Sequence, residues 1–391
     1  NYINPYTGKV LTAVEALSGA LAHGEDLECN GGHSSNGSGT SGFHTDYNAQ
    51  INNMIDQAVR TDKGIFTENS VDISVHRLMT ARIETGEFDG NIKLKQDAAE
   101  RQANATALRA ERKALVRQIN AEGVVMLQNK GMLPLDASCG SVVIVGSWQT
   151  NGSTGLYAQA SRNETTIQAG LREGLTAMNP NIKITTITSN SLTDANKADI
   201  AAADAVIVVT GTSSSYSQED HDRATIALPD GQDTLASTVG KLNPNTVVIM
   251  ETCGPMQVTT FQNDVNAILW SSFGGQWKTG QADIITGVAN PSGKVTDTWY
   301  QNVSDTGVSD VPAITDYDML PSEGKNGRTY MYYNGANEPS YPFGFGLSYT
   351  TFAYTNENVS VQGDQVVFEA DVTNVGTVEG VETVQAYTRD L

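Results

Sequence analysis

Six short apolar segments, separated by segments with helical patterns, constrain the fold of this chain most strongly. The apolar segments are residues 124–127, 141–145, 182–187, 205–209, 246–251 and 267–270, and the helical patterns lie near 166–175, 194–203, 229–242 and 280–288. Strands that alternate with helices in this way form a mostly parallel sheet with helices on both faces. We therefore expect an α/β fold for the central part of the chain.

The region before this alternation has a different pattern. Residues 1–95 show three helical patterns, at 11–22, 46–59 and 68–84, and no strands of their own. These helices would suit either a small bundle or the outer helices of a barrel whose strands lie elsewhere. A polar linker at 93–104 then leads into a helix that carries Leu108, Leu115 and Ile119 on one face and ends at Gly123.

The region after the alternation changes to a period of two. Val366, Phe368, Ala370 and Val372 fall on one side of an extended segment, which predicts antiparallel strands of a β-sandwich. The roughly 40 residues from Phe352 onward are fewer than the ~100 that such a domain usually needs. We expect only the beginning of the domain in this chain.

Charge and length exclude several classes of protein. A chain of 391 residues should hold two or three hydrophobic cores. The formal net charge of −20 opposes binding to nucleic acid or to an anionic membrane. No apolar run reaches the ~18 residues of a membrane helix, so we expect neutral or weakly polar partners, no nucleic acid and no membrane.

Common cofactor and nucleophile motifs do not fit this sequence. The three cysteines, Cys29, Cys139 and Cys253, leave at least one thiol without an intramolecular partner and have no metal-ligand spacing. The loop at 146–152 lacks the glycine spacing of dinucleotide-binding loops and the Lys-Ser/Thr of a P-loop. No G-x-S-x-G nucleophile motif occurs either.

Glycosylation sequons favour a secreted protein. They occur at Asn36, Asn104, Asn151, Asn163, Asn302 and Asn358. The chain opens at Asn1 without Met or a signal peptide, so we expect this end to be processed or truncated. We predict an extracellular protein, with the periplasm as the alternative.

Glu219 is the strongest candidate for chemistry. It lies in a polar loop directly after the apolar strand 205–209, and ligands of open α/β sheets bind outside the carboxyl ends of the strands. Acidic neighbours would raise the pKa of Glu219, whereas His221 and Arg223 would lower it, so its titration can be tuned for general acid catalysis. An ordinary solvated acidic loop is the alternative interpretation.

The longer motifs resemble family 3 glycoside hydrolases. The run EDHDRATIALPDGQ at 219–232 resembles the E-x-x-D-R motif and the Leu-Pro-x-x-Gln helix start of that family's second domain. The segment GVVMLQNKGMLPL at 123–135 resembles the strand that enters this domain, and NPSGK at 290–294, GRTY at 327–330 and YPFGFGLSY at 341–349 resemble its exit. DVTNVG at 371–376 is similar to the start of the fibronectin-III-like domain that often follows.

The resemblance implies roles for individual residues. It makes Glu219 the acid/base of a retaining glycosidase, with Asp222 and Arg223 as an ion pair that supports the loop. Tyr157 and Gln159 correspond to a loop that borders the sugar. The family's nucleophilic Asp belongs to a Ser-Asp-Trp motif in a preceding β/α barrel, and no barrel segment with this motif occurs here, so the nucleophile is not in this chain. The resemblance implies no metal and no organic cofactor.

The resemblance also implies a division into domains. We expect the C-terminal part of a β/α barrel at 1–95, a linker and helix at 96–122, an α/β sandwich with the acid/base loop at 123–345, and the incomplete start of a fibronectin-III-like β-sandwich at 346–391. An N-terminal barrel segment that carries the nucleophilic Asp is the expected protein partner.

The predicted function is that of a retaining, exo-acting β-glycosidase that releases a terminal sugar from the non-reducing end of β-linked, plant-type oligosaccharides. DLECN at 26–30 and GEFD at 86–89 resemble β-xylosidases more than β-glucosidases, although Asn30 stands where the xylosidase pattern has Gly. The same features are compatible with a β-glucosidase. A different class also stays open, namely a non-catalytic carbohydrate-binding or interaction protein that retains the α/β domain.

Overall fold

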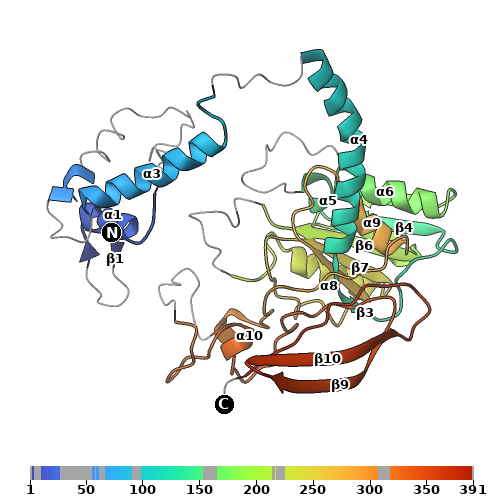
Figure 1. Cartoon of the computed structure of the whole chain (residues 1–391). Helices are drawn as coiled ribbons and strands as arrows, with labels where there is room; N and C mark the ends of the chain where they lie inside the picture. Colours follow the sequence, from blue (N-terminus) through green and yellow to red (C-terminus); the bar gives the residue numbers. More distant parts are fainter. Residues whose placement is uncertain are drawn as a thin grey trace. The chain divides into compact units, whose positions relative to one another are not determined.

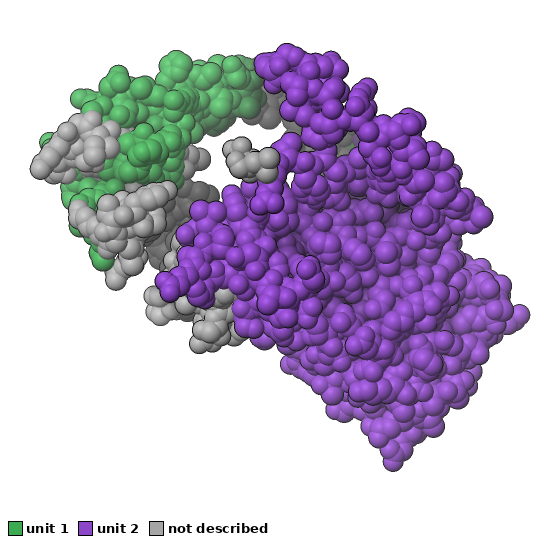
Figure 2. All heavy atoms as spheres, turned by 90° about the horizontal axis from the view of Figure 1, so that it is seen from below, with its two compact units in different colours: residues 1–103 green, residues 104–391 purple. Residues whose placement is uncertain are grey.

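The computed structural model describes residues 2–3, 10–26, 55–57, 59–60, 67–89, 98–152, 165–213, 216, 225–306 and 318–389. The chain divides into two compact units, residues 1–103 and residues 104–391 (Figure 2).

The first unit contains two described helices and a short strand pair. Helix α1 spans Ala13–Ala22 and α3 spans Glu68–Glu84, and each begins with a threonine N-cap in a capping box. These two predicted helices are confirmed, whereas most of the helix predicted at 46–59 lies outside the described residues. Strands β1 (Tyr2–Ile3) and β2 (Val10–Leu11) pair antiparallel and correct the expectation that this region has no strands. Strands of two residues are too short to show an alternating pattern.

A six-stranded sheet forms the centre of the second unit (Figure 1). Its strands are β3 (Val125–Asn129), β4 (Ser141–Val145), β5 (Lys183–Ile187), β6 (Ala205–Gly211), β7 (Thr246–Glu251) and β8 (Ala267–Ser271), in the order β3-β8-β7-β6-β4-β5. All neighbours are parallel except β3, which pairs antiparallel with β8 at one edge. The mostly parallel sheet is confirmed.

Helices cover both faces of this sheet. Helices α6 (Ile167–Met178) and α9 (Gly280–Ile285) pack on one face, and α7 (Asp194–Ala202) and α8 (Gln232–Leu242) pack on the other. Every residue of β6, β7 and β8 is buried, because both faces of these strands are covered. Shorter elements are α5 (Trp148–Asn151), the 3₁₀ turn Val303–Thr306 and α10 (Thr329–Tyr332).

Helix α4 spans Ala98–Gly123 and begins earlier than the sequence pattern indicates. The predicted linker at 93–104 is therefore wrong from Ala98 onward, because Ala, Glu, Arg and Gln in this stretch are strong helix formers. The C-terminal turn of α4 packs on the sheet unit through buried Ala121. Its predicted apolar face, which carries Leu108, Leu115 and Ile119, is exposed.

A β-hairpin follows the sheet. Strands β9 (Phe352–Gln362) and β10 (Gln365–Asn374) pair antiparallel, as predicted, with one irregularity in the register between Glu369 and Asp371. The segment after β10 contacts the sheet unit, since Asn290 Nδ2 donates to Glu379 O (2.9 Å) and Lys294 pairs with Glu382 (3.4 Å). The apolar residues Val366, Phe368 and Val372 of β10 are exposed.

Candidate functional site

The carboxyl edge of the parallel sheet is the candidate site. The loop that carries Glu219, Asp222 and Arg223 leaves this edge after β6, and the loop that carries Tyr157 and Gln159 leaves it after β4 and α5. These five predicted site residues lie outside the described residues. The structure does describe the base of each loop.

Gln232 fixes the base of the Glu219 loop. Its side chain is buried at the start of α8, where Nε2 donates to Gly211 O (2.9 Å) and Oε1 accepts from Gly211 N (2.7 Å). Gly211 is the last residue of β6, so this paired contact joins the two ends of the segment 212–231. The sequence pattern identified Gln232 only as part of a helix start.

Tyr216 fixes the same loop farther along the chain and packs against the core of the sheet unit. Its hydroxyl donates to the carbonyl oxygens of Thr225 (3.1 Å) and Ala227 (2.6 Å), on the returning side of the loop. Gln257 N also donates to Ile226 O (2.6 Å). Glu219 follows Tyr216 by three positions in the sequence. Tyr216 was not singled out from the sequence.

The loop after α5 is fixed by the segment 276–278. Thr165 N donates to Gln276 O (3.0 Å), and Lys278 N donates to Thr165 O (3.2 Å). At the other end of the loop, a Cβ added to Gly152 would lie 2.7 Å from Lys278 Nζ. Lys278 therefore contacts both ends of the loop that carries Tyr157 and Gln159.

A buried ion pair connects these loop bases. The side chains of Glu251, at the end of β7, and Lys278 form a salt bridge and have no exposed surface. Trp148 Nε1 donates to Glu251 Oε2 (2.8 Å), and Gly274 N donates to Oε1 (3.1 Å). Burial lowers the pKa of Lys278, and the negative charge of Glu251 opposes that shift.

Sequence analysis did not identify this pair. The sequence did contain a signal for Glu251, because a charged residue ends an otherwise apolar strand there. Glu219 similarly follows an apolar strand. Lys278 gives no such signal, because it lies in a loop that the fold brings to β7.

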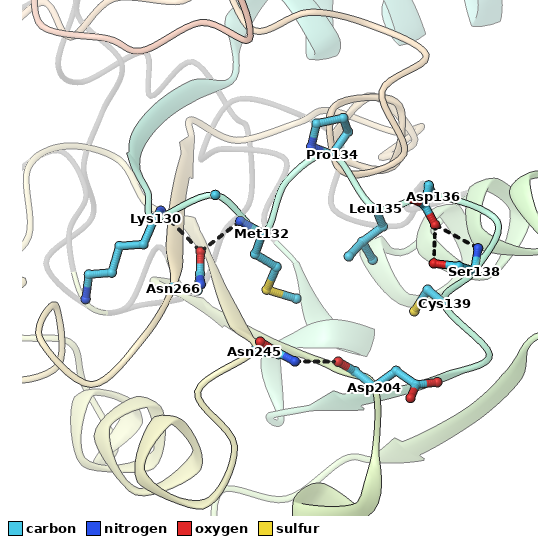
Figure 3. Close-up of a pocket in the computed structure, with 11 residues that line it drawn as sticks. Lys130, Met132, Pro134, Leu135, Asp136, Ser138, Cys139, Asp204, Asn245 and Asn266 are labelled. Carbon is cyan, nitrogen blue, oxygen red and sulfur yellow. Dashed lines mark hydrogen bonds between the residues drawn. The ribbon is translucent and has the colours of Figure 1, made fainter.

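A pocket lies at the opposite, amino edge of the sheet (Figure 3). Its polar groups already serve the fold. Asp204 accepts hydrogen bonds from Gly140 N (3.0 Å), Ser141 N (2.8 Å) and Ser141 Oγ (2.9 Å), and Asn266 Oδ1 accepts from Lys130 N and Met132 N. The Ser141 hydroxyl is the main cause of a pKa of Asp204 below its usual value. This pocket is not the candidate site.

No group of three or more His, Cys, Asp or Glu side chains among the described residues is arranged to hold a metal ion. Of the helices described, none is both long and apolar enough to cross a membrane.

Comparison with known proteins defines the family. Residues 124–349 match the Glycosyl hydrolase family 3 C-terminal domain. The chain therefore belongs to glycosyl hydrolase family 3, as the motifs predicted.

Similar curated proteins include plant and fungal proteins named as β-xylosidases. Beta-D-xylosidase 1 of Arabidopsis thaliana is 32% identical over 302 residues, which cover 75% of this chain and 38% of the relative. A probable exo-1,4-beta-xylosidase of Aspergillus terreus is 32% identical over 303 residues, which cover 74% of this chain and 36% of the relative. The chain thus spans well under half the length of these relatives.

Solved structures share the fold. A GH3 exo-beta-xylosidase in complex with a xylobiose aziridine probe has a TM-score of 0.65 at 25% identity, with 88% of this chain and 42% of that chain covered. The beta-glucosidase D2-BGL of Chaetomella raphigera has a TM-score of 0.59 at 22% identity, with 84% of this chain and 51% of that chain covered.

Proposed function

We propose that this chain is the acid/base-bearing part of a retaining, exo-acting β-glycosidase that releases a terminal sugar from β-linked oligosaccharides. One observation carries the proposal. In a member of glycosyl hydrolase family 3, the loop that holds Glu219 is fixed at its base, through Gln232, at the carboxyl edge of the sheet. Ligands of open α/β sheets bind at this edge.

The proposed mechanism uses two carboxyl groups. In retaining glycosidases they lie ~5–5.5 Å apart; one attacks the anomeric carbon, while the other protonates the leaving oxygen and then activates water. Glu219 is the proton donor and later the base. Asp222 and Arg223 support its loop, and Tyr157 and Gln159 border the sugar. An N-terminal barrel segment supplies the nucleophilic Asp, and no metal or cofactor takes part.

β-Xylosides are the favoured substrates. The named relatives from Arabidopsis thaliana and Aspergillus terreus are a β-xylosidase and a probable exo-1,4-β-xylosidase. The segments at 26–30 and 86–89 resemble the same group. A β-glucosidase is the second candidate, since β-glucosidases share this fold. Comparing kcat/KM for aryl β-xyloside and aryl β-glucoside separates the two.

A non-catalytic carbohydrate-binding or interaction protein remains the alternative of another class. That alternative predicts sugar binding without turnover even when a barrel segment is present. The Glu219 motif and two anchors that hold its loop favour the enzyme, because a protein without turnover has no need of a positioned proton donor.

We also propose that the protein is a secreted glycoprotein. The relatives named above are plant and fungal proteins, and four sequon residues, Asn104, Asn151, Asn302 and Asn358, are exposed. Glycopeptide mass spectrometry of the native protein tests this. Unmodified peptides at every sequon of extracellular material would contradict the glycoprotein proposal.

Glu219→Gln in the complete enzyme tests the function. The variant keeps the shape of the side chain but has no proton to give, so hydrolysis of an alkyl β-xyloside or a xylo-disaccharide should fall by about 10²–10⁴-fold. Aryl substrates with good leaving groups need less protonation and should lose less in the glycosylation step. The measurement is kcat/KM for both kinds of substrate.

Asp194→Asn is the matched control, since Asp194 is fully exposed on α7. It should retain the parent rates. A loss below about tenfold for both substrates with Glu219→Gln would assign the proton transfer to another residue. NMR of the first product should show the β anomer, and initial release of the α anomer would exclude the retaining mechanism.

A further inference from the structure

Glu251 and Lys278 are buried ionisable groups without a role in the proposed mechanism. Both side chains have no exposed surface, and they lie at the edge from which both candidate loops leave the sheet. Burying two charges costs more free energy than an apolar pair of the same size in many proteins. Stability is therefore a weak explanation for an ion pair at this position.

Lys278 is connected to the loop 153–164. Its ammonium group packs against the backbone of Gly152, where even a Cβ atom would come within 2.7 Å of Nζ. Its backbone N–H holds Thr165, the first described residue after that loop (3.2 Å). A shift of Lys278 would therefore move both ends of the loop that carries Tyr157 and Gln159.

Glu251 is connected to the loop 212–231 through Trp148. The indole N–H donates to Glu251 Oε2 (2.8 Å), and the ring lies directly on Gly211, where an added Cβ would come within 2.0 Å of Nε1. In addition, Thr212 N donates to the backbone oxygen of Glu251 (3.1 Å). The carboxylate thus sets the direction in which the chain leaves β6 toward Glu219.

We propose that Glu251 and Lys278 are a positioning pair that fixes the ends of the acid/base loop and of the sugar-bordering loop relative to each other. The proposal rests on the proposed function, because it assigns Glu219 and Tyr157 to those loops. Trp148 and Gly274 donate hydrogen bonds to Glu251, and Lys278 packs on Gly152. The relative position of the two loops therefore depends on this one ion pair.

The test compares single and double neutral variants in the complete enzyme. Lys278→Met and Glu251→Gln each leave one buried charge without its opposite charge, so both should lower Tm. The double variant K278M/E251Q removes both charges and should recover most of that Tm. Its kcat/KM on a xylo-disaccharide should nevertheless stay about 10–10²-fold below the parent, since an ångström of misplacement of a catalytic group costs this much.

The leaving group provides the second readout. If the pair positions the proton donor, K278M/E251Q should lose more activity on the disaccharide than on an aryl β-xyloside. A purely structural role predicts that activity on both substrates returns together with Tm. That result would overturn the proposal.

The matched control is R117M/D283N, which removes another ion pair of the same unit. Arg117 on α4 and Asp283 on α9 form two hydrogen bonds of 2.6 Å. The control should leave the ratio of rates on the two substrates unchanged. An equal change of that ratio in the control would overturn the proposal as well.

Hydrogen exchange on this chain alone tests the inference without catalysis. Peptides that cover 146–166 and 211–227 should exchange faster in K278M/E251Q than in the parent and in R117M/D283N. Unchanged exchange would overturn the inference even if the function holds. If Glu219→Gln keeps the parent activity while K278M/E251Q exchanges faster, the proposed function is refuted. The coupling of the two loops by the ion pair would still hold.

Discussion

At the scale of single residues, Gln232 shows how one amide positions a loop. Its two hydrogen bonds pair with the N–H and the C=O of the same residue, Gly211, so the strand end cannot rotate without breaking both. A buried backbone group that loses its partner costs as much as a broken hydrogen bond.

Replacing Gln232 should therefore destabilise the folded chain. Gln232→Leu leaves the N–H and C=O of Gly211 without these partners, and we expect a loss of about 2–4 kcal/mol in the free energy of unfolding. Urea denaturation of the chain measures this loss. Gln118→Leu, on the exposed surface of α4, is the control and should change stability by less than about 0.5 kcal/mol. Equal losses of stability in both variants would contradict the role of the two hydrogen bonds between Gln232 and Gly211.

Asp204 provides a pH-dependent prediction. Its folded-state pKa is below the usual 3.8, chiefly because the Ser141 hydroxyl donates to the carboxylate. A carboxylate of this kind adds stability above its unfolded pKa and loses it as the pH falls through the folded pKa. Asp204→Asn should lower Tm at pH 7, and its difference from the parent should shrink below about pH 4.

Differential scanning fluorimetry from pH 7 to pH 3 follows both proteins. The Asp194→Asn variant, which removes only a fully exposed carboxylate paired with Lys197, is the control and should lower Tm at pH 7 much less than Asp204→Asn does. A Tm difference that grows toward low pH would show that Asp204 acts differently.

Residues differ in how much of their role can be predicted from sequence. Glu219 could be proposed from sequence because the motif around it is contiguous, and its role stays a prediction. Gln232 and Tyr216 belong to the same stretch, but their roles depend on where the returning chain lies. Lys278 lies in a loop and its partner Glu251 lies 27 positions away in sequence, at the end of β7, and no local pattern carries that information.

At the scale of elements, the strands could be predicted most accurately. Strands β4 and β7 have the expected bounds, because a continuous apolar run between polar ends marks a doubly covered strand. Helix α8 starts at Gln232, three residues after the expected 229, since Asp230 and Gly231 adopt positive φ and form a turn. Such a turn is not visible in the spacing of apolar residues.

Helix α6 provides an element-scale prediction. It lies so close to the segment 276–278 that a Cβ added to Gly170 would come within 2.1 Å of Lys278 O. Gly170→Ala should push the helix from the sheet and cost about 1–3 kcal/mol, as overpacking does. Gly123→Ala, where a Cβ meets nothing within 4 Å, is the control. Comparable urea midpoints for the two variants would contradict this close packing.

At the scale of the whole molecule, the domain boundaries remain predictions. The proposed division places barrel helices at 1–95, the α/β sandwich at 123–345 and the start of a fibronectin-III-like domain at 346–391. Exposed apolar side chains on the described helices favour binding of a further protein segment. Those of Val75, Ile83, Leu115 and Ile119 are 50–59% exposed. Apolar surface of this kind marks interaction sites where it is contiguous.

The chain alone should therefore bind a hydrophobic dye and show no turnover of aryl β-xyloside or β-glucoside. Adding a barrel segment with the nucleophilic Asp should reduce dye binding and restore activity, because the retaining mechanism needs both carboxyl groups. Fluorescence and product release measure the two effects in one titration. Turnover by the chain alone would place the nucleophile within it, and a monodisperse chain that binds no dye would contradict the exposed surface.

The contact between Gln232 and Gly211 has a consequence for how relatives of this chain can diverge. A loop that is closed at its base can gain or lose residues at its tip while the sheet stays unchanged, and each doubling of loop length costs only about 0.6 kcal/mol. Insertions between Tyr216 and Glu219, ahead of the E-x-x-D-R motif, would thus cost little folding free energy, whereas insertions next to Gly211 would break its hydrogen bonds to Gln232. Sequence length should therefore vary among homologues ahead of this motif and stay constant within it.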